Sequence, residues 1–231
     1  MNNEFFDAIK KGDLGKIERL LSITPCLTYE KDENGLSPVM VAAYSHHQKV
    51  LNFLSEQAGS LNIFEAAAMG KTNLVLRHIA RDSSLTNAYA CDGFQPLGLA
   101  CYFGHYETAE NLIKLGAAVN SPSCNMLGAA PIHSATVAGH VKIALLLIRN
   151  NANPNARDIN GFTPLHIAAQ NGDTEMLRAL LFNGADMSIR TRKEKLAIDL
   201  AMEAGQNAAV KLLKEGITRR FRPRIMSPVN N

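Results

Sequence analysis

The sequence predicts an all-α solenoid of about seven helix-turn-helix repeats with short β-hairpin fingers. Three observations lead to this fold class. Pro96, Pro131 and Pro164 recur 33–35 residues apart, a period typical of solenoids. The residues after Pro164 have the apolar spacing of two short amphipathic helices. The first half of the chain also matches itself when it is shifted by 58 residues.

The stretch 160–172 shows the repeating unit most clearly. It opens with an Asn-Gly pair that suits a tight hairpin turn. Thr163 and Pro164 then begin a helix, because a proline in the first turn has no helical N–H bond to lose. Gly172 can adopt the left-handed conformation that ends this helix. A second helix is predicted over 174–182, with an apolar stripe at helical spacing formed by Met176, Leu177, Leu180 and Leu181.

The same stretch carries a resemblance to a known family. Residues 163–168 read Thr-Pro-Leu-His-Ile-Ala, and the chain resembles the ankyrin repeat family over about residues 2–216, most strongly over 92–189. The resemblance implies that the threonine hydroxyl and the histidine ring bond each other across the first turn, which gives Thr163 and His166 a scaffold role. It also implies that partners contact the hairpin tips and the exposed end of the first helix, which line the concave side.

The repeats are expected to form one domain over residues 1–216. Shifting the chain by 58 residues places Gly12 on Gly70 and His47 on His105, which resolves seven repeats. The second repeat is short, so we expect its outgoing finger to be missing and the row of fingers to have a notch there. The predicted repeats lie near 2–34, 35–60, 61–92, 93–127, 128–160, 161–193 and 194–216.

Composition limits the classes of function. The net charge is +3, and the tail 217–231, which we expect to be basic and disordered, holds four arginines and no acidic residue. Removing those 4 from the 24 basic residues leaves 20 against 21 acidic ones, which is not a nucleic-acid-binding balance. An acidic partner or a membrane lipid is the second interpretation of this tail. No apolar run reaches the roughly 20 residues that span a bilayer.

The four cysteines have no C-x-x-C spacing, which is typical of reduced thiols. We therefore expect a cytoplasmic monomer that binds neither nucleic acid nor membrane.

No catalytic site, cofactor or metal is predicted, so the chain is not expected to be an enzyme. No H-E-x-x-H or paired C-x-x-C spacing occurs. Six of the seven histidines fall at positions that the repeat explains. His133 and His166 fill the signature position. His47, His105 and His140 stand at the start of the second helix, and His46 stands at a helix-ending position.

The predicted function is a non-catalytic protein–protein interaction module that binds a partner protein on its concave face. Aromatic residues concentrate at contact positions of the fourth repeat, and aromatic anchors beside a polar and basic rim are typical of binding hot spots. The alternative for these rings is packing on neighbouring repeats, where they would fill the space left by the missing finger. The predicted contact residues are Tyr44, Met69, Tyr89, Phe94, Tyr102, Phe103, Met126, Arg157, Phe162, Gln170, Asn171 and Arg192.

Two other functions stay open. The chain could be a regulatory subunit or an enzyme with a small-ligand site in the notch between repeats two and three, near His46, His47 and His78. It could also be a purely structural spacer.

Overall fold

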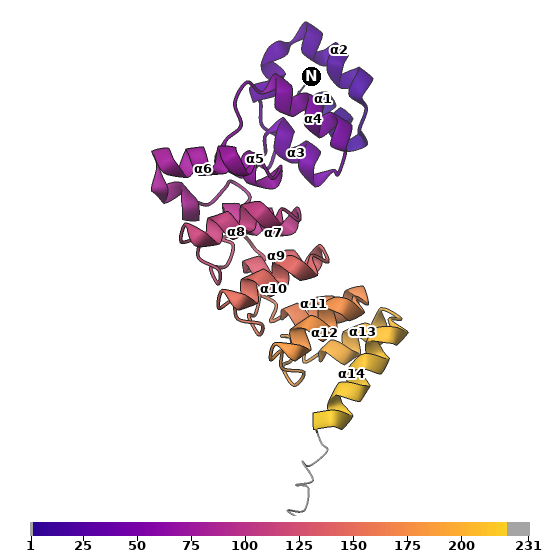
Figure 1. Ribbon diagram of the computed structural model, residues 1–231. Coiled ribbons are helices and arrows are strands. Elements are labelled where there is room, and N and C mark those ends of the chain that lie inside the picture. The colour runs from indigo at the N-terminus through magenta and orange to yellow at the C-terminus, as the bar shows by residue number, and fades with distance from the viewer. Residues whose placement is uncertain (1, 221–231) are drawn as a thin grey trace, which may run out of the picture.

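The computed structural model of the protein describes residues 2–220, in which the α-helices follow one another as seven pairs (Figure 1). The all-α solenoid predicted above is thus confirmed. The pairs are α1 (Asn2–Lys11) and α2 (Leu14–Ile23), α3 (Pro38–Tyr44) and α4 (Gln48–Gln57), α5 (Ile63–Ala68) and α6 (Thr72–Arg81), α7 (Pro96–Tyr102) and α8 (Tyr106–Lys114), α9 (Pro131–Val137) and α10 (Val141–Arg149), α11 (Pro164–Asn171) and α12 (Thr174–Phe182), and α13 (Ala197–Glu203) and α14 (Asn207–Arg220).

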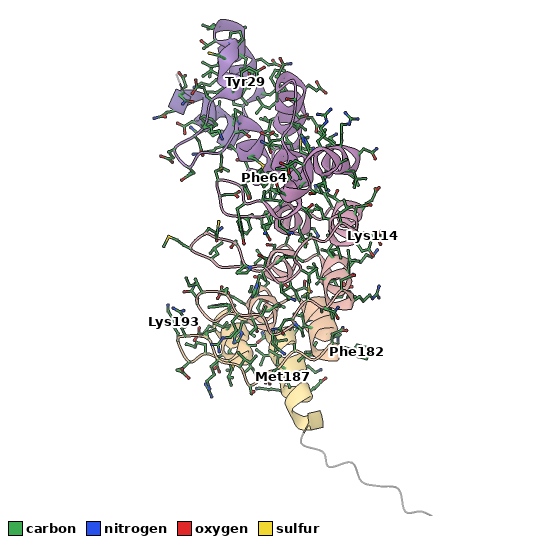
Figure 2. The ribbon with its side chains drawn as sticks, turned by 90° about the vertical axis from the view of Figure 1, so that its left-hand side faces the viewer. Tyr29, Phe64, Lys114, Phe182, Met187 and Lys193 are labelled. Carbon is green, nitrogen blue, oxygen red and sulfur yellow. The ribbon has the colours of Figure 1, made fainter. Side chains whose placement is uncertain are left out.

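The helices form two layers along the stack. The first helix of each pair packs on the first helices of its neighbours, as α7 does on α5 and α9. From α6 onward the second helices pack on one another in the same way, as α10 does on α8 and α12. In Figure 2 the loops that precede the first helices project to one side, with Lys193, while Lys114 of α8 and Phe182 of α12 lie on the other side. We call these the finger side and the outer side.

The third residue of the first helix ties that helix to the loop before it. In α11 the Nδ1 atom of His166 accepts hydrogen bonds from the Thr163 backbone N–H at 3.1 Å and from its hydroxyl at 2.8 Å, as the resemblance implied. Glu65 and Asp199 replace the histidine in α5 and α13, and each carboxylate accepts a backbone N–H three residues earlier at 2.8 Å. The first helices therefore begin in the same way although the third residue differs, because each of these side chains accepts a hydrogen bond from the backbone.

The apolar interior is divided into two clusters. One contains buried residues from Phe5 to Leu61, and the other runs from Met40 and Ile63 to Leu213. Three partly buried side chains pack against both clusters: Leu36, Leu74 and Phe103. The division follows the sequence, since the first cluster belongs almost entirely to α1–α4 and the chain reaches α5 before the second cluster continues.

The 58-residue duplication is visible in the fold. A 3₁₀-helix follows α2 at Pro25–Tyr29, and a second one follows α6 at Ser83–Asn87, which is 58 residues later. The Nε2 atom of His47 bonds the Lys10 carbonyl at 3.0 Å, and that of His105 bonds the Ala68 carbonyl at 2.9 Å. Helices α1–α4 and α5–α8 are thus two copies of one four-helix block.

Within residues 2–220 the fingers are tight turns without β-strand. Each is closed by a backbone bond across its base, for example from Ala90 N–H to the Phe94 carbonyl and from Asp158 N–H to the Phe162 carbonyl, both at 2.9 Å. Between α4 and α5 the chain has only residues 58–62, so the finger expected to be missing is indeed missing there.

The predicted notch, however, is closed at the tips. The Cys91 thiol, in the finger before α7, donates to the Gly35 carbonyl in the finger before α3 at 3.1 Å. The Tyr44 hydroxyl donates to Asp92 Oδ2 at 2.7 Å across the same boundary. Because the short connection leaves nothing between them, the fingers of repeats two and four meet directly.

The last helix ends beyond the predicted domain boundary at 216. Helix α14 extends to Arg220, and residues 221–231 of the predicted disordered tail lie outside the described residues.

Candidate functional site

The histidines of the repeat act as links between neighbouring repeats. The two signature histidines are about 1% exposed, and their Nε2 atoms donate to carbonyls of the next finger: His133 to Ala156 and Phe162 at 3.0 and 3.1 Å, and His166 to Lys195 at 3.2 Å. Burial lowers the pKa of both rings. A buried neutral ring with both nitrogens bonded to backbone groups has no free atom for acid–base chemistry.

The histidines that begin the second helices link the repeats in the opposite direction. Besides His47 and His105, His140 bonds the Tyr102 carbonyl through Nε2 at 3.2 Å. Burial also lowers the pKa of His105. The described part of the chain contains no group of three or more His, Cys, Asp or Glu side chains placed to hold a metal ion.

The structure has a small pocket at the place hypothesised for a small-ligand site, between repeats two and three. A pocket of about 240 Å³ lies there, lined by side chains that include His46, Met69, Lys71 and Phe103. The other two histidines of that hypothesis do not line it. His47 bonds the Lys10 carbonyl, and His78 bonds the Leu61 carbonyl through Nε2 at 2.9 Å. The histidines named for this site therefore do not converge on one ligand.

Three of the predicted contact aromatics form one cluster. The ring centroid of Tyr44 lies 6.0 Å from that of Tyr102 and 5.3 Å from that of Phe103, and the latter two rings meet edge to face at 5.0 Å. Burial is the main reason why the pKa of Tyr44 is raised, and the carboxylate of Asp92 raises it further. Since Phe103 also packs on both apolar clusters, these rings largely fill the space beside the missing finger.

The other predicted aromatics are divided between packing and exposure. Phe94 is partly buried against the larger apolar cluster, and the Phe162 ring lies 5.9 Å from that of His166. Tyr89 is 44% exposed, with its hydroxyl 3.0 Å from Ser121 Oγ. The structure thus brings Tyr44, Tyr102 and Phe103 together in one cluster. Phe94, Phe162 and Tyr89 lie outside this cluster.

A group of exposed apolar side chains lies on or beside the fingers before α9 and α11. Met126 is 89% exposed at the tip of the finger before α9, and Leu127, Val137 and Ile159 are also exposed. The last three lie at the finger and first-helix positions where the sequence predicts contacts, although that prediction gave most weight to repeat four. Their exposure depends on neighbouring side chains, which periodicity does not reveal.

Backbone bonds join successive fingers into a row. Cys124 N–H donates to the Gly93 carbonyl at 2.9 Å, and Ile159 N–H donates to the Leu127 carbonyl at 3.0 Å. Arg192 N–H donates to the Asn160 carbonyl at 2.9 Å in the same manner. The tips before α7, α9, α11 and α13 therefore have fixed relative positions.

The predicted polar contact residues flank this row. Arg157 and Arg192 are exposed on the last two fingers, and Gln170 and Asn171 are exposed at the end of α11. Met69 is partly buried at the end of α5.

The outer side has a hollow of its own. A groove of about 850 Å³ lies between α10, α12 and α14, and its lining includes Leu145, Arg178 and Phe182. The Phe182 side chain is 92% exposed. It provides an apolar reference point on the opposite side from the fingers (Figure 2).

Comparisons with known proteins identify the repeats. Residues 132–181 match a family described as "Ankyrin repeats (many copies)", and residues 92–124 match "Ankyrin repeat". The chain is 34% identical over 123 residues to tyrosine-protein kinase Shark of Drosophila melanogaster, which covers 53% of the chain and 13% of that kinase. It is 30% identical over 160 residues to target of rapamycin complex 2 subunit AVO2 of Saccharomyces cerevisiae, covering 68% and 38% respectively.

A third relative is cyclin-dependent kinase inhibitor 2A of Monodelphis domestica, 33% identical over 113 residues that cover 48% of the chain and 64% of that protein. The chain spans well under half of the kinase and of the complex subunit, so the similarity concerns only part of each protein. None of the helices in residues 2–220 has both the length and the apolar character needed to cross a bilayer.

Ankyrin repeats are generally non-catalytic modules for protein–protein interaction. The stacked helix pairs, the Thr163–His166 bond and the two matched segments together show that this chain belongs to the ankyrin repeat family.

Proposed function

We propose that the protein binds a partner protein on its finger side, which is the concave face of the predicted function, and that it catalyses no reaction itself. The observation that carries this proposal is the exposure of Met126, Leu127, Val137 and Ile159 on or beside fingers that backbone bonds hold in a row. Exposed apolar groups on a rigid support are favourable binding anchors, because little conformational entropy is lost when the partner docks.

The aromatic cluster has a supporting role in this proposal. Tyr44, Tyr102 and Phe103 close the boundary between the two copied blocks, and Tyr102 and Phe103 line a hollow of about 440 Å³ together with the exposed Val137. The sequence-based expectation placed the main anchors here. The partly buried packing of Phe103 instead favours anchors further along the row, at Met126 and Ile159.

The experiment compares two equally exposed apolar side chains on opposite sides. Met126, at 89% exposure, and Phe182, at 92%, are each replaced by serine. Partners are captured by cross-linking from a lysate of the cells that make the protein and are quantified by mass spectrometry. We expect Met126→Ser to lose the specific partner and Phe182→Ser to retain it. Retention by the first variant and loss by the second would contradict the proposal.

The expected cytoplasmic location is part of the same proposal. Cys26, Cys91 and Cys124 are exposed and free of disulfides. Thiols of this kind fit a reducing compartment. Cell fractionation tests the location directly, and recovery with an extracellular or membrane fraction would contradict it.

A further inference from the structure

We propose that the partner segment is an acidic stretch of protein with at least one apolar side chain, and that it lies along the fingers before α9, α11 and α13. This inference rests on the proposed function and adds the chemistry of the partner. It is carried by the distribution of charge along the finger row.

Four exposed cations lie on the last two fingers: Arg157, Arg190, Arg192 and Lys193. Their hydrogen bonds leave their charges available. Arg157 Nη2 donates to the Arg190 carbonyl at 2.9 Å, and Arg190 Nη1 donates to the Glu194 carbonyl at 2.8 Å, so both guanidinium groups contact neutral backbone acceptors. None of the four forms an ion pair with another residue in the described range 2–220.

Nearby carboxylates do not cancel this charge. Asp158 Oδ1 accepts the backbone N–H groups of Asn160 and Phe162, both at 2.8 Å, which directs the carboxylate into its own turn. Lys195 pairs with Glu203, so the Glu203 carboxylate does not neutralise the four exposed cations. Glu194 is the remaining exposed acid on the finger before α13. The two fingers therefore present a net positive surface.

The two groups of cations are also held close together. A Cβ atom placed on Gly161 would lie 2.9 Å from Arg157 Nη2 and 3.0 Å from the Arg192 backbone nitrogen. The Arg157 guanidinium therefore packs where the finger before α11 meets the finger before α13. An acidic segment that crosses these fingers would meet cations from both.

The apolar contribution comes from the adjoining part of the row. Ile159 is exposed on the same finger as Arg157, Met126 and Leu127 are exposed on the finger before it, and Ile159 N–H is bonded to the Leu127 carbonyl. An apolar side chain docked here would bury surface, while neighbouring carboxylates of the same segment would reach Arg157 and Arg192. Guanidinium groups suit carboxylates because they can form two parallel hydrogen bonds.

The opposite end of the row has the opposite sign. The finger before α3 carries exposed Glu30 and Glu33 against one exposed Lys31, and its Asp32 carboxylate is directed into its own turn as Asp158 is. An acidic segment is therefore repelled at this end and attracted at the other, which confines it to the fingers before α9, α11 and α13. A basic segment would have the reverse preference and would meet one large exposed apolar side chain beside its site, Tyr29, whereas Met126, Leu127 and Ile159 are exposed at the other end.

A nucleic acid fits the same cations less well. Single-stranded nucleic acids use exposed aromatic rings for base stacking along a basic groove. The aromatic ring on these two fingers, Phe162, is partly buried beside His166. The combination of exposed aliphatic groups and cations matches a protein segment.

The test uses the whole chain immobilised against a display library of random 16-residue peptides. We expect enriched peptides to be acidic and to contain an apolar residue. A synthetic enriched peptide should bind the Arg192→Glu/Lys193→Glu variant about tenfold or more weakly, because like charges are brought together. This change leaves the Arg192 N–H bond to Asn160 in place, and circular dichroism confirms the fold. The matched charge control is Lys142→Glu/Arg178→Glu on α10 and α12, which should bind as the wild type does.

The outcomes separate this inference from the proposed function. Neutral or basic peptides that bind both charge variants equally but fail on Met126→Ser would overturn the acidic chemistry and leave finger-side binding intact. Acidic peptides whose binding depends on Lys142 and Arg178 would place the site on the outer side and overturn both. A library without any enriched peptide would also count against both. Retention of a random single-stranded oligonucleotide, lost in the Arg192→Glu/Lys193→Glu variant, would assign the cations to nucleic acid instead.

Discussion

The packing of a helix-ending glycine against the histidine of the next repeat yields a quantitative prediction. Gly70 has φ of +65°, and a Cβ atom there would lie 2.4 Å from His105 Nδ1. Gly139 occupies the same place in a later repeat with φ of +73°, but the nearest atom to its added Cβ is Asp173 Oδ2 at 3.7 Å. Both Gly→Ala changes place a side chain in the left-handed region, and only Gly70→Ala also meets a ring.

The difference between the two variants follows from these contacts. Left-handed backbone costs a non-glycine residue roughly 1–2 kcal/mol, which is the expected loss for Gly139→Ala. In Gly70→Ala the His105 ring must also move, which sacrifices its bond to the Ala68 carbonyl, worth about 0.5–1.5 kcal/mol, and strains its rotamer by a similar amount. We therefore expect Gly70→Ala to lower the free energy of unfolding by about 2–5 kcal/mol.

Urea unfolding followed by circular dichroism measures both losses. Hydrogen exchange over α5–α8 should accompany it, because repeat arrays can unfold in parts. An NMR titration adds a local readout: the pKa of His105, now lowered by burial, should move toward its ordinary value in Gly70→Ala. In the Gly70→Ala/His105→Ala variant, the loss relative to His105→Ala should fall to the Gly139→Ala value. Equal losses for the two single variants would refute the reasoning.

Three further predictions concern the interior and the closed boundary. Burial lowers the pKa of His133 and His166, so the unfolded chain binds more protons than the folded chain; stability is complete above a pH of about 6.5 and is lost as the pH falls through the lowered values. A Tm series from about pH 8 to about pH 5 measures this loss, and a flat series would contradict it. Tyr44→Phe removes a hydroxyl that donates to a carboxylate and should lower the free energy of unfolding, measured in urea, by about 1.5–3 kcal/mol; an unchanged midpoint would contradict this. Leu147→Ala, at 0% exposure, should cost about 2–5 kcal/mol, whereas Met126→Ala should change stability by less than about 0.5 kcal/mol; equal losses would argue against the assigned burial.

The periodic part of the structure could be predicted because each local rule is satisfied within one repeat. Pro96, Pro131 and Pro164 begin helices where the pattern placed them, and the Thr163–His166 bond forms as implied. Replacements that keep the chemistry could have been found by the same rule. Asp199, for instance, accepts the Leu196 N–H just as the histidine nitrogen does in α9 and α11.

Contacts between repeats were harder to anticipate. The bond from Cys91 to Gly35 joins residues 56 positions apart, and it depends on how closely two fingers approach when the one between them is absent. The same is true of exposure. Phe103 and Val137 are both near the ends of first helices, yet Phe103 packs on both apolar clusters while Val137 is exposed. Such differences arise from neighbouring side chains and not from position in the repeat.

His46 shows how neighbouring repeats constrain each other. It has φ of +56° at a place where other repeats have glycine. In the next repeat the second helix is preceded by Lys71, where other copies have His105 or His140, so the histidine ring that packs against the glycine in those copies is absent here. A side chain with a Cβ atom is therefore sterically acceptable here, although the backbone is strained.

The copying of a four-helix block has a mechanical consequence. A duplicated block inherits the side chains that pack within it. The contacts between the two copies, however, have no counterpart in the original block. Here that joint is the five-residue link before α5, spanned by few large side chains and by the Tyr44–Asp92 bond. Under tension applied along the array, the first rupture should occur at this seam, which would release α1–α4 as a unit while the remaining pairs stay folded.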